Sequence, residues 1–195
     1  MDLLLIRHAR PERVETRDGS PADPPLDATG RAQAARLAEW LDGERIDRIY
    51  SSPLRRARET AAALVAARGL ALEIEPRVAE FDQHSDRYVP LEQLKVEDYD
   101  RWLAFVQGGY GDAIDFEAFC REAIAGLEDV IQRNPGRCVA VVCHGGVVNV
   151  WAAHVLGLAP RLFFEPDYAS IHRFVAARSG ERSLACLNER PRAGR

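Results

Sequence analysis

The sequence lacks long apolar runs and any large excess of charge of one sign. Among its 195 residues no apolar run approaches the length of a membrane span, and the start, MDLLLIRH, has no basic segment ahead of a signal-type apolar region. We therefore expect a cytoplasmic protein without a membrane partner. The formal net charge is −4, so no overall basic field favours a nucleic-acid partner.

Sequence signatures of metal and nucleotide sites are also missing. The chain contains no CxxC pair, no HExxH, no acidic EF-hand loop and no GxxxxGK[ST] segment. Cys138 and Cys143 lie in an apolar run, where a thiol is typically a small buried hydrophobic group. We expect neither a metal nor a cofactor.

What the chain does contain is a regular alternation of short apolar segments with helical patterns. The alternation predicts an α/β fold, a three-layer sandwich with a mostly parallel central sheet flanked by helices, in a single domain over residues 1–195. A basic tail, 190–195, is expected to be disordered. Strands are expected at 2–6, 46–51, 70–75, 138–143, 170–175 and 183–187, and helices at 28–41, 53–68, 115–133 and 145–157. On the 28–41 helix, one face should carry Ala35, Leu37, Ala38 and Leu41.

Residues 81–112 interrupt this rhythm, because they are acidic and carry several aromatic side chains. They predict a small, partly helical cap insertion that sets substrate specificity, and their negative charge disfavours polyanionic substrates. Tyr99 and Trp102 stand at helical spacing, which is more typical of a small core than of a ligand stack.

Polar residues follow each of the first four predicted core strands. In an open parallel sheet the carboxyl ends of the strands meet at one edge, where ligands bind. Helix N-termini and arginine side chains both favour anions, and the arginine fork matches phosphate oxygens. The residues alone therefore predict a phosphoester or phosphate site. Its candidate members are Arg7, His8, Ser51, Ser52, Arg55, Arg56, Arg58, Glu80, Asp82, His144, Gly145 and Gly146.

Four segments, LIRHA, SSPLRRARETA, AEFD and VVCHGG, resemble the successive motifs of the histidine phosphatase superfamily, the phosphoglycerate mutase-like fold. PLDATGRAQAARLAEWL also resembles the first helix of that family, and LNE resembles its last strand. The resemblance covers nearly the whole chain, and four motifs in the right order at strand ends are specific.

The resemblance implies a role for each matching residue. His8 matches the nucleophile that becomes a phosphohistidine, while Arg7, Arg56 and His144 match the groups that hold the transferring phosphoryl. Arg56 is the match rather than Arg55 because an alanine follows it. Glu80 matches the proton donor to the leaving oxygen.

Four further residues complete the expected site or compete for a role in it. Asp82 is the main alternative to Glu80 as the acid. Gly145 is expected to contact the phosphate. His84 closely follows the acid and is a candidate substrate contact, with a plain position on the cap surface as the alternative. In this family, residues just after the nucleophile usually make a secondary phosphate contact. Those residues are different in this chain, and Arg10 is a candidate to make the contact instead.

Those differences lie just after the nucleophile. Ala9 stands where the family usually has glycine, Arg10 and Pro11 replace an acid–threonine pair, and Val14 replaces an asparagine.

The expected function is that of a metal-independent phosphatase acting on a small phosphomonoester through a phosphohistidine. Phosphoglycerate mutase-type transfer is the alternative, and a non-catalytic phosphate-binding pseudoenzyme is a second one. The partner is a small phosphorylated substrate, and a homodimer stays open. The substrate itself and the balance between phosphatase and mutase activity are not readable from the sequence.

Overall fold

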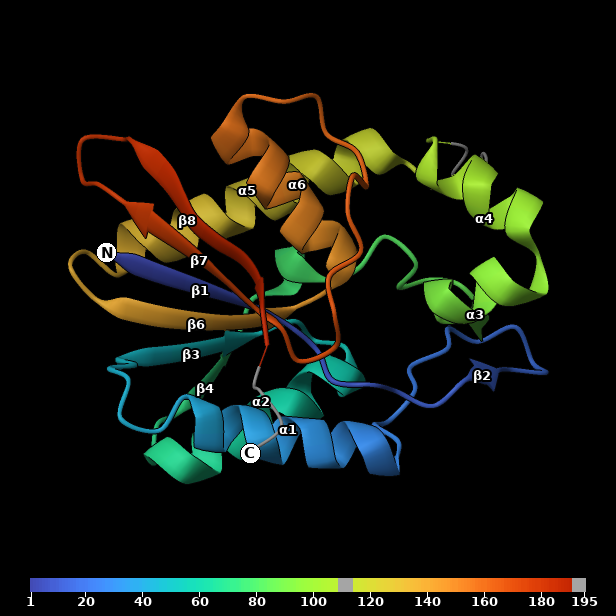
Figure 1. Cartoon of the computed structure of the whole chain (residues 1–195), viewed down its shortest axis with the longest axis horizontal. Helices are drawn as coiled ribbons and strands as arrows, with labels where there is room; N and C mark the ends of the chain where they lie inside the picture. The colour runs from blue at the N-terminus through green and yellow to red at the C-terminus, as the bar shows by residue number, and fades with distance from the viewer. Residues whose placement is uncertain (109–113, 191–195) are drawn as a thin grey trace.

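The computed structural model describes residues 1–108 and 114–190, and its centre is a six-stranded sheet in the order β4-β3-β6-β1-β7-β8 (Figure 1). Neighbours among β4, β3, β6 and β1 pair in parallel, whereas β7 pairs antiparallel with both β1 and β8. The prediction of a mostly parallel sheet is confirmed. The strands are β1 (Asp2–Arg7), β3 (Arg48–Ser51), β4 (Leu72–Ile74), β6 (Cys138–Cys143), β7 (Ile171–Ala176) and β8 (Arg182–Glu189).

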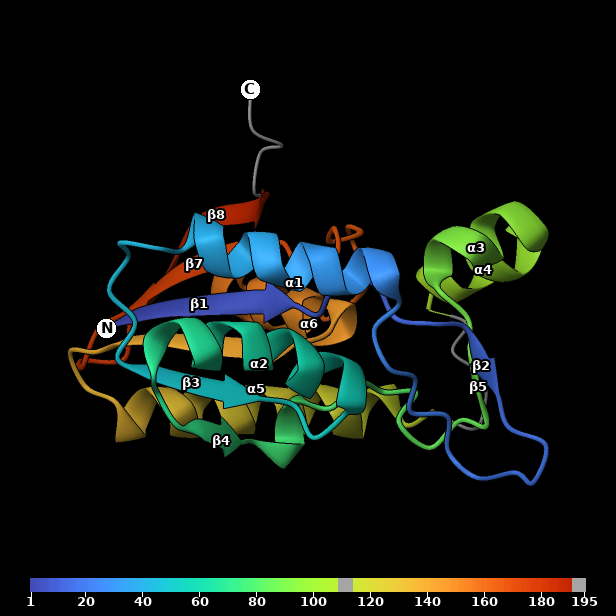
Figure 2. The same ribbon diagram turned by 90° about the horizontal axis from the view of Figure 1, so that it is seen from below.

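Helices cover both faces of this sheet, as the predicted three-layer arrangement requires. Helices α1 (Ala28–Trp40) and α2 (Arg55–Arg68) lie on one face, and α5 (Phe116–Arg133) and α6 (Gly145–Leu156) lie on the other (Figures 1 and 2). The short 3₁₀ helix η1 (Pro76–Val78) contacts α5. Strand β1 is buried on both sides, since Leu4 and Ile6 pack in one core cluster and Leu3 and Leu5 in the other. A strand covered on both faces explains the unbroken apolar run.

Two local predictions need correction. In α1 the buried face carries Ala34 rather than Ala35. Helix α1 packs closely against the backbone of Arg10 at Gly30, where an added Cβ would lie 2.0 Å from the Arg10 carbonyl oxygen. Because this contact requires Gly30 to face inward, it fixes which other residues of the helix face the core. Helix α2 starts at Arg55 instead of Pro53, with Leu54 in extended conformation as its N-cap.

The cap contains one element pair that the sequence analysis did not predict. Residues 81–108 form β5 (Arg87–Tyr88), α3 (Leu91–Glu97) and α4 (Tyr99–Val106). Strand β5 pairs antiparallel with β2 (Val14–Glu15), which comes from the loop after β1 and was expected to be irregular. Figure 2 shows α3, α4 and this pair set off from the sheet, beyond the carboxyl end of β1. Cap residues 109–112 lie outside the described residues.

Several other expectations can be compared with the structure. Cys120, Cys138 and Cys143 are buried, Cys186 is partly buried, and all four thiols are free. In the described part of the chain no helix has the length and apolarity needed to cross a membrane. Of the predicted disordered tail, Arg190 forms an ion pair with Asp167, and 191–195 lie outside the described residues.

Candidate active site

Strand β1 holds the predicted nucleophile rigidly at the carboxyl end of the sheet. The backbone N–H of His8 donates to the carbonyl of Cys143 on β6 (2.9 Å), and the next N–H, of Ala9, donates to Thr60 Oγ1 on α2 (2.9 Å). His8 is 2% exposed. A side chain fixed at both flanking amides and enclosed in this way has little freedom to turn.

The hydrogen bonds of His8 define its tautomer. Nδ1 lies 2.8 Å from the carbonyl oxygen of Ala9, which can only accept, so Nδ1 carries the proton. Nε2 therefore keeps its lone pair, and the Nε–H of Arg56 donates to it at 3.3 Å. Burial, and then the charges of Arg56 and Arg7, hold the pKa of His8 well below its usual value. The imidazole is neutral at pH 7, with Nε2 able to attack an electrophile.

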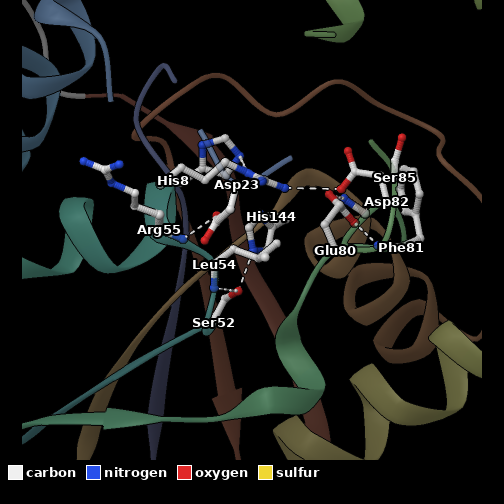
Figure 3. A network of polar contacts seen from close by, with 12 residues as sticks. His8, Asp23, Ser52, Leu54, Arg55, Glu80, Phe81, Asp82, Ser85 and His144 are labelled. Carbon is white, nitrogen blue, oxygen red and sulfur yellow. Dashed lines mark hydrogen bonds and ion pairs between the residues drawn. The ribbon is translucent and has the colours of Figure 1, made fainter. Parts of the chain in front are cut away.

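His144 lies beside His8, with 5.0 Å between the ring centroids. Its Nε2 is 2.7 Å from Ser52 Oγ, which also accepts the backbone N–H of Leu54 at 3.2 Å (Figure 3). We assign the Ser52 hydroxyl as the donor to Nε2, because Nε2 is the one acceptor that this hydroxyl meets among the described residues, and the ring proton of His144 is then on Nδ1. Nδ1 is buried and meets no hydrogen-bond partner among the described residues. It can donate to an oxygen of a bound ligand.

Burial also keeps His144 neutral. Desolvation, followed by the charges of Arg56, His8 and Arg7, holds its pKa well below the usual value.

Two buried guanidinium groups supply positive charge at the same place. Arg56 is 1% exposed, lies over the ring of Tyr88 at 4.6 Å, and pairs with Asp82 at 3.3 Å. Arg7 donates through Nη1 to the carbonyl of Pro166, and its guanidinium lies 4.0 Å over the ring of Tyr168. The Nε of Arg7 has no hydrogen-bond partner within the described residues, so it remains available to an anion.

The two carboxylates at this site differ in environment. Gly146 N–H donates to Glu80 Oε2 at 2.9 Å and Phe81 N–H donates to Oε1 at 3.3 Å. Burial, and then the negative charge of Asp82, raise the pKa of Glu80 to about 7, against the opposing effects of the Gly146 amide and Arg56. Burial also raises the pKa of Asp82, but Arg56 opposes the shift through its charge and a hydrogen bond. Glu80 is therefore the group able to deliver and take back a proton near pH 7.

Gly145 and Gly146 begin α6 in different surroundings. An added Cβ at Gly146 would lie 2.2 Å from Glu80 Oε1 and 2.8 Å from the Phe81 ring, so only glycine fits there. Gly145 lines the same cavity as Arg7. A Cβ added at Gly145 would have Arg7 Nε as its nearest neighbour, at 3.8 Å.

The two other candidates lie away from the charged cluster. Arg10 is half-exposed and uses its guanidinium within α1, donating from Nε to Asp27 at 2.6 Å and from Nη2 to Thr29 at 2.9 Å. That Arg10 replaces a missing phosphate contact stays a prediction, and in this structure Asp27 and Thr29 at the start of α1 hold its guanidinium. His84 is exposed and lies at the rim of the cavity.

One end of a cavity of about 1010 Å³ between the sheet edge and the cap is lined by Arg7, His8, Arg56, Glu80 and Asp82. The sequence analysis missed Tyr88, Tyr168 and Asn149, which surround it or support it. Tyr168 and Tyr88 stand in no recognisable motif. Asn149 was identifiable, as a polar residue in an otherwise apolar helix segment, GGVVNVWAA.

Metal coordination is not evident in what the structure describes. Across 1–108 and 114–190 there is no group of three or more His, Cys, Asp or Glu side chains that could hold a metal ion.

Comparison with known proteins decides the family. The sequence model of the histidine phosphatase superfamily (branch 1) matches residues 3–189. The chain belongs to this superfamily. Phosphoserine phosphatase 1 of Hydrogenobacter thermophilus is 32% identical to this histidine phosphatase over 185 residues, covering 87% of this chain and 85% of the relative.

Two further comparisons agree with this assignment. Adenosylcobalamin/alpha-ribazole phosphatase of Escherichia coli is 28% identical over 167 residues, 81% of this histidine phosphatase and 80% of the relative. The crystal structure of a putative alpha-ribazole-5'-P phosphatase from E. coli K-12 superposes with a TM-score of 0.75 at 26% identity, covering 97% of both chains. The names of these relatives support the predicted enzyme class, a phosphoric monoester hydrolase.

Proposed function

We propose that this histidine phosphatase hydrolyses a small phosphomonoester through a covalent phosphohistidine on His8. The observation that carries the proposal is the state of His8: buried, neutral and protonated on Nδ1, with the Nε2 lone pair facing Arg56. A neutral imidazole nitrogen held against a cation can attack phosphorus as soon as a phosphoryl group binds there.

In the first step, Nε2 of His8 forms a bond to phosphorus while the bond from phosphorus to the alcohol oxygen breaks. Glu80, protonated, gives its proton to that oxygen, and the alcohol leaves. The guanidinium groups of Arg7 and Arg56 and the Nδ1–H of His144 compensate the charge on the three phosphoryl oxygens, which is the main demand of phosphoryl transfer.

In the second step, water attacks the phosphorus of the phosphohistidine. Glu80, now a carboxylate, takes a proton from the water, the bond between nitrogen and phosphorus breaks, and phosphate is released. His8 regains its lone pair and Glu80 its proton, so the enzyme is restored. A pKa near 7 suits Glu80 to both transfers.

The test combines turnover with trapping of the intermediate. The wild type and His8→Ala are given a ³²P-labelled aryl phosphate at pH 6, with EDTA present, and samples are quenched in alkali, in which phosphohistidine is stable. We expect phosphate release and labelled protein with the wild type, and neither with His8→Ala. Phosphate release by His8→Ala at the wild-type rate contradicts the proposal, as does loss of activity in EDTA.

Product analysis separates the alternatives. A phosphatase gives free phosphate in equal amount to the alcohol even when excess 3-phosphoglycerate is present as acceptor. Label that moves mainly to the acceptor would favour the mutase, and a protein that binds phosphate without forming labelled His8 would be a pseudoenzyme.

A further inference from the structure

The cavity continues well beyond the groups that would hold the phosphate, and its character changes there. The half-buried side chains lining this outer part are mostly apolar, and the charged ones, such as Arg101 and Glu165, are exposed at the mouth. Among the lining residues that the structure describes, the buried arginines are Arg7 and Arg56, and both belong to the phosphate end. The apolar walls include Phe81, Leu94, Trp102, Phe105, Phe163 and Phe164.

One wall is tied to the main body by the side chain of Asn149. Asn149 of α6 accepts the backbone N–H groups of Phe163 (2.8 Å) and Phe164 (3.1 Å) through Oδ1. Its Nδ2 donates to the carbonyl of Phe164 (3.0 Å) and to that of Gly145 (2.9 Å). The loop bearing the two phenyl rings is therefore tied to the start of α6, the same helix end that carries the glycines of the site.

The opposite wall comes from the cap. The ring of Phe81 packs against Phe105 of α4 and Phe119 of α5, both at 5.5 Å between centroids, and so joins the cap to the main body. Trp102 also lines the cavity, with Lys95 Nζ 4.5 Å from its ring. This corrects the expectation that Trp102 and Tyr99 fill a small core, since Tyr99 is exposed and Trp102 faces the cavity.

We propose that the alcohol portion of the substrate is an aromatic or similarly apolar group of one to two rings, without a second anionic group near the phosphate. This inference rests on the proposed phosphatase function and specifies its substrate class. A second carboxylate or phosphate held deep in the cavity would be desolvated without a buried cation beside it, which is unfavourable. Apolar rings between two apolar walls would instead be stabilised by burial and by stacking on the aromatic side chains.

The first experiment compares phosphomonoesters that differ in bulk and charge but share a primary alcohol as leaving group. We would measure kcat/KM for 2-(2-naphthyl)ethyl phosphate, ethyl phosphate and O-phosphoserine, so that differences do not reflect leaving-group basicity. We expect the naphthyl ester to be preferred by roughly 10- to 100-fold, from the apolar area it buries at about 25 cal/mol per Å². Equal values, or a preference for ethyl phosphate or phosphoserine, would overturn the inference while leaving the proposed function intact.

Variants then locate the preference in the two walls. Trp102→Ala in the cap and Phe164→Ala in the fixed loop should each lower the ratio of kcat/KM for the naphthyl ester to that for ethyl phosphate. Leu158→Ala is the matched control, because Leu158 is 49% exposed and lies outside the cavity lining. Thermal unfolding of each variant checks folding. If both wall variants keep the wild-type ratio, the walls do not select the substrate.

Binding separates a failure of this inference from a failure of the proposed reaction. Calorimetry with the wild type compares 2-(2-naphthyl)ethylphosphonate with ethylphosphonate, neither of which can be hydrolysed. Tighter binding of the naphthyl compound supports the apolar subsite even for a protein that releases no phosphate, in which case only the proposed reaction fails. Equal binding of the two compounds overturns the inference.

Discussion

At the scale of single residues, the site gives different environments to two carboxylates, of which the family resemblance favoured Glu80 as the acid and left Asp82 as the alternative. Glu80 is buried and accepts hydrogen bonds from the backbone amides of Gly146 and Phe81, whereas the Asp82 side chain is 26% exposed and paired with Arg56. We therefore expect Glu80→Gln to lower kcat by about 10²-fold or more for an alkyl phosphate, whose leaving oxygen needs a proton. The loss should be much smaller for 4-nitrophenyl phosphate, whose leaving group needs none.

Asp82→Asn should leave this leaving-group dependence in place and change the pH profile instead. Because Glu80 must carry its proton, wild-type activity should fall as the pH rises through about 7. The charge of Asp82 helps to raise the pKa of Glu80, so its removal should move the fall to lower pH. If Asp82→Asn is the variant that loses alkyl phosphates selectively, the two roles are reversed.

Ser52 is the residue that sets which nitrogen of His144 faces the ligand. Ser52→Ala should lower kcat about tenfold or more, because His144 Nε2 loses its partner and the ring can adopt the other tautomer. Ser51→Ala is the control, since Ser51 is equally buried but donates to the backbone oxygen of Ser52. The ¹⁵N chemical shifts of His144 should report a protonated Nδ1 in the wild type and in Ser51→Ala. A protonated Nε2 in the wild type would contradict the assignment.

At the scale of elements, the start of α6 must come close enough to Glu80 for a backbone hydrogen bond. Gly146→Ala places a Cβ 2.2 Å from Glu80 Oε1, so α6 or the acid has to move. We expect a loss of stability of about 1–3 kcal/mol together with a fall in kcat. Urea unfolding and steady-state kinetics measure both.

Gly145→Ala provides the comparison one residue away. Its Cβ would meet nothing closer than 3.8 Å, so the free energy of unfolding should stay within about 0.5 kcal/mol of the wild type. Equal destabilisation by the two alanines would mean that the approach to Glu80 is not the cause.

Elements also show which predictions the sequence could support. Strands β1 and β6 and helices α5 and α6 lie close to the predicted ranges, because long apolar patterns and capping residues are local signals. The pairing of β2 with β5 was missed, since each has two residues and no periodicity, and the partners are about 70 residues apart. The ion pair of Arg10 with Asp27 was not predicted either, because the two residues are distant in the sequence and no motif links them.

The same limit applies within the site. Positions near strand ends and helix starts pointed to Arg7, His8, Glu80 and His144, because parallel strands bring such positions together, whereas Arg56 was singled out by the family resemblance. Tyr168 could not be found in this way, because it reaches Arg7 from a loop that has no regular structure of its own. The apolar walls were likewise hidden, since aromatic residues at helical spacing look the same whether they face a core or a cavity.

At the scale of the whole molecule, the raised pKa of Glu80, the proposed acid, acts against the stability of the fold. Glu80 titrates at about 4.5 when exposed to water and at about 7 in the folded protein, so folding favours its protonated form. Below pH 4.5 the carboxyl is protonated in both states and costs nothing. As the pH rises from 4.5 to about 7, the unfolded chain gains the ionised form while the folded chain resists it, so stability falls over this interval and is constant above it.

Glu80→Gln removes that titration and keeps the size of the side chain. We expect the variant to be more stable than the wild type by about 1–3 kcal/mol at pH 8, from the size of the pKa shift at about 1.4 kcal/mol per unit. The difference should shrink as the pH falls to 5, where the buried carboxyl is already protonated. Urea unfolding of both proteins at pH 5, 6.5 and 8, in phosphate-free buffer, measures the difference. A stability gain that is the same at all three pH values, or that grows at pH 5, would show that Glu80 is not held protonated by its burial.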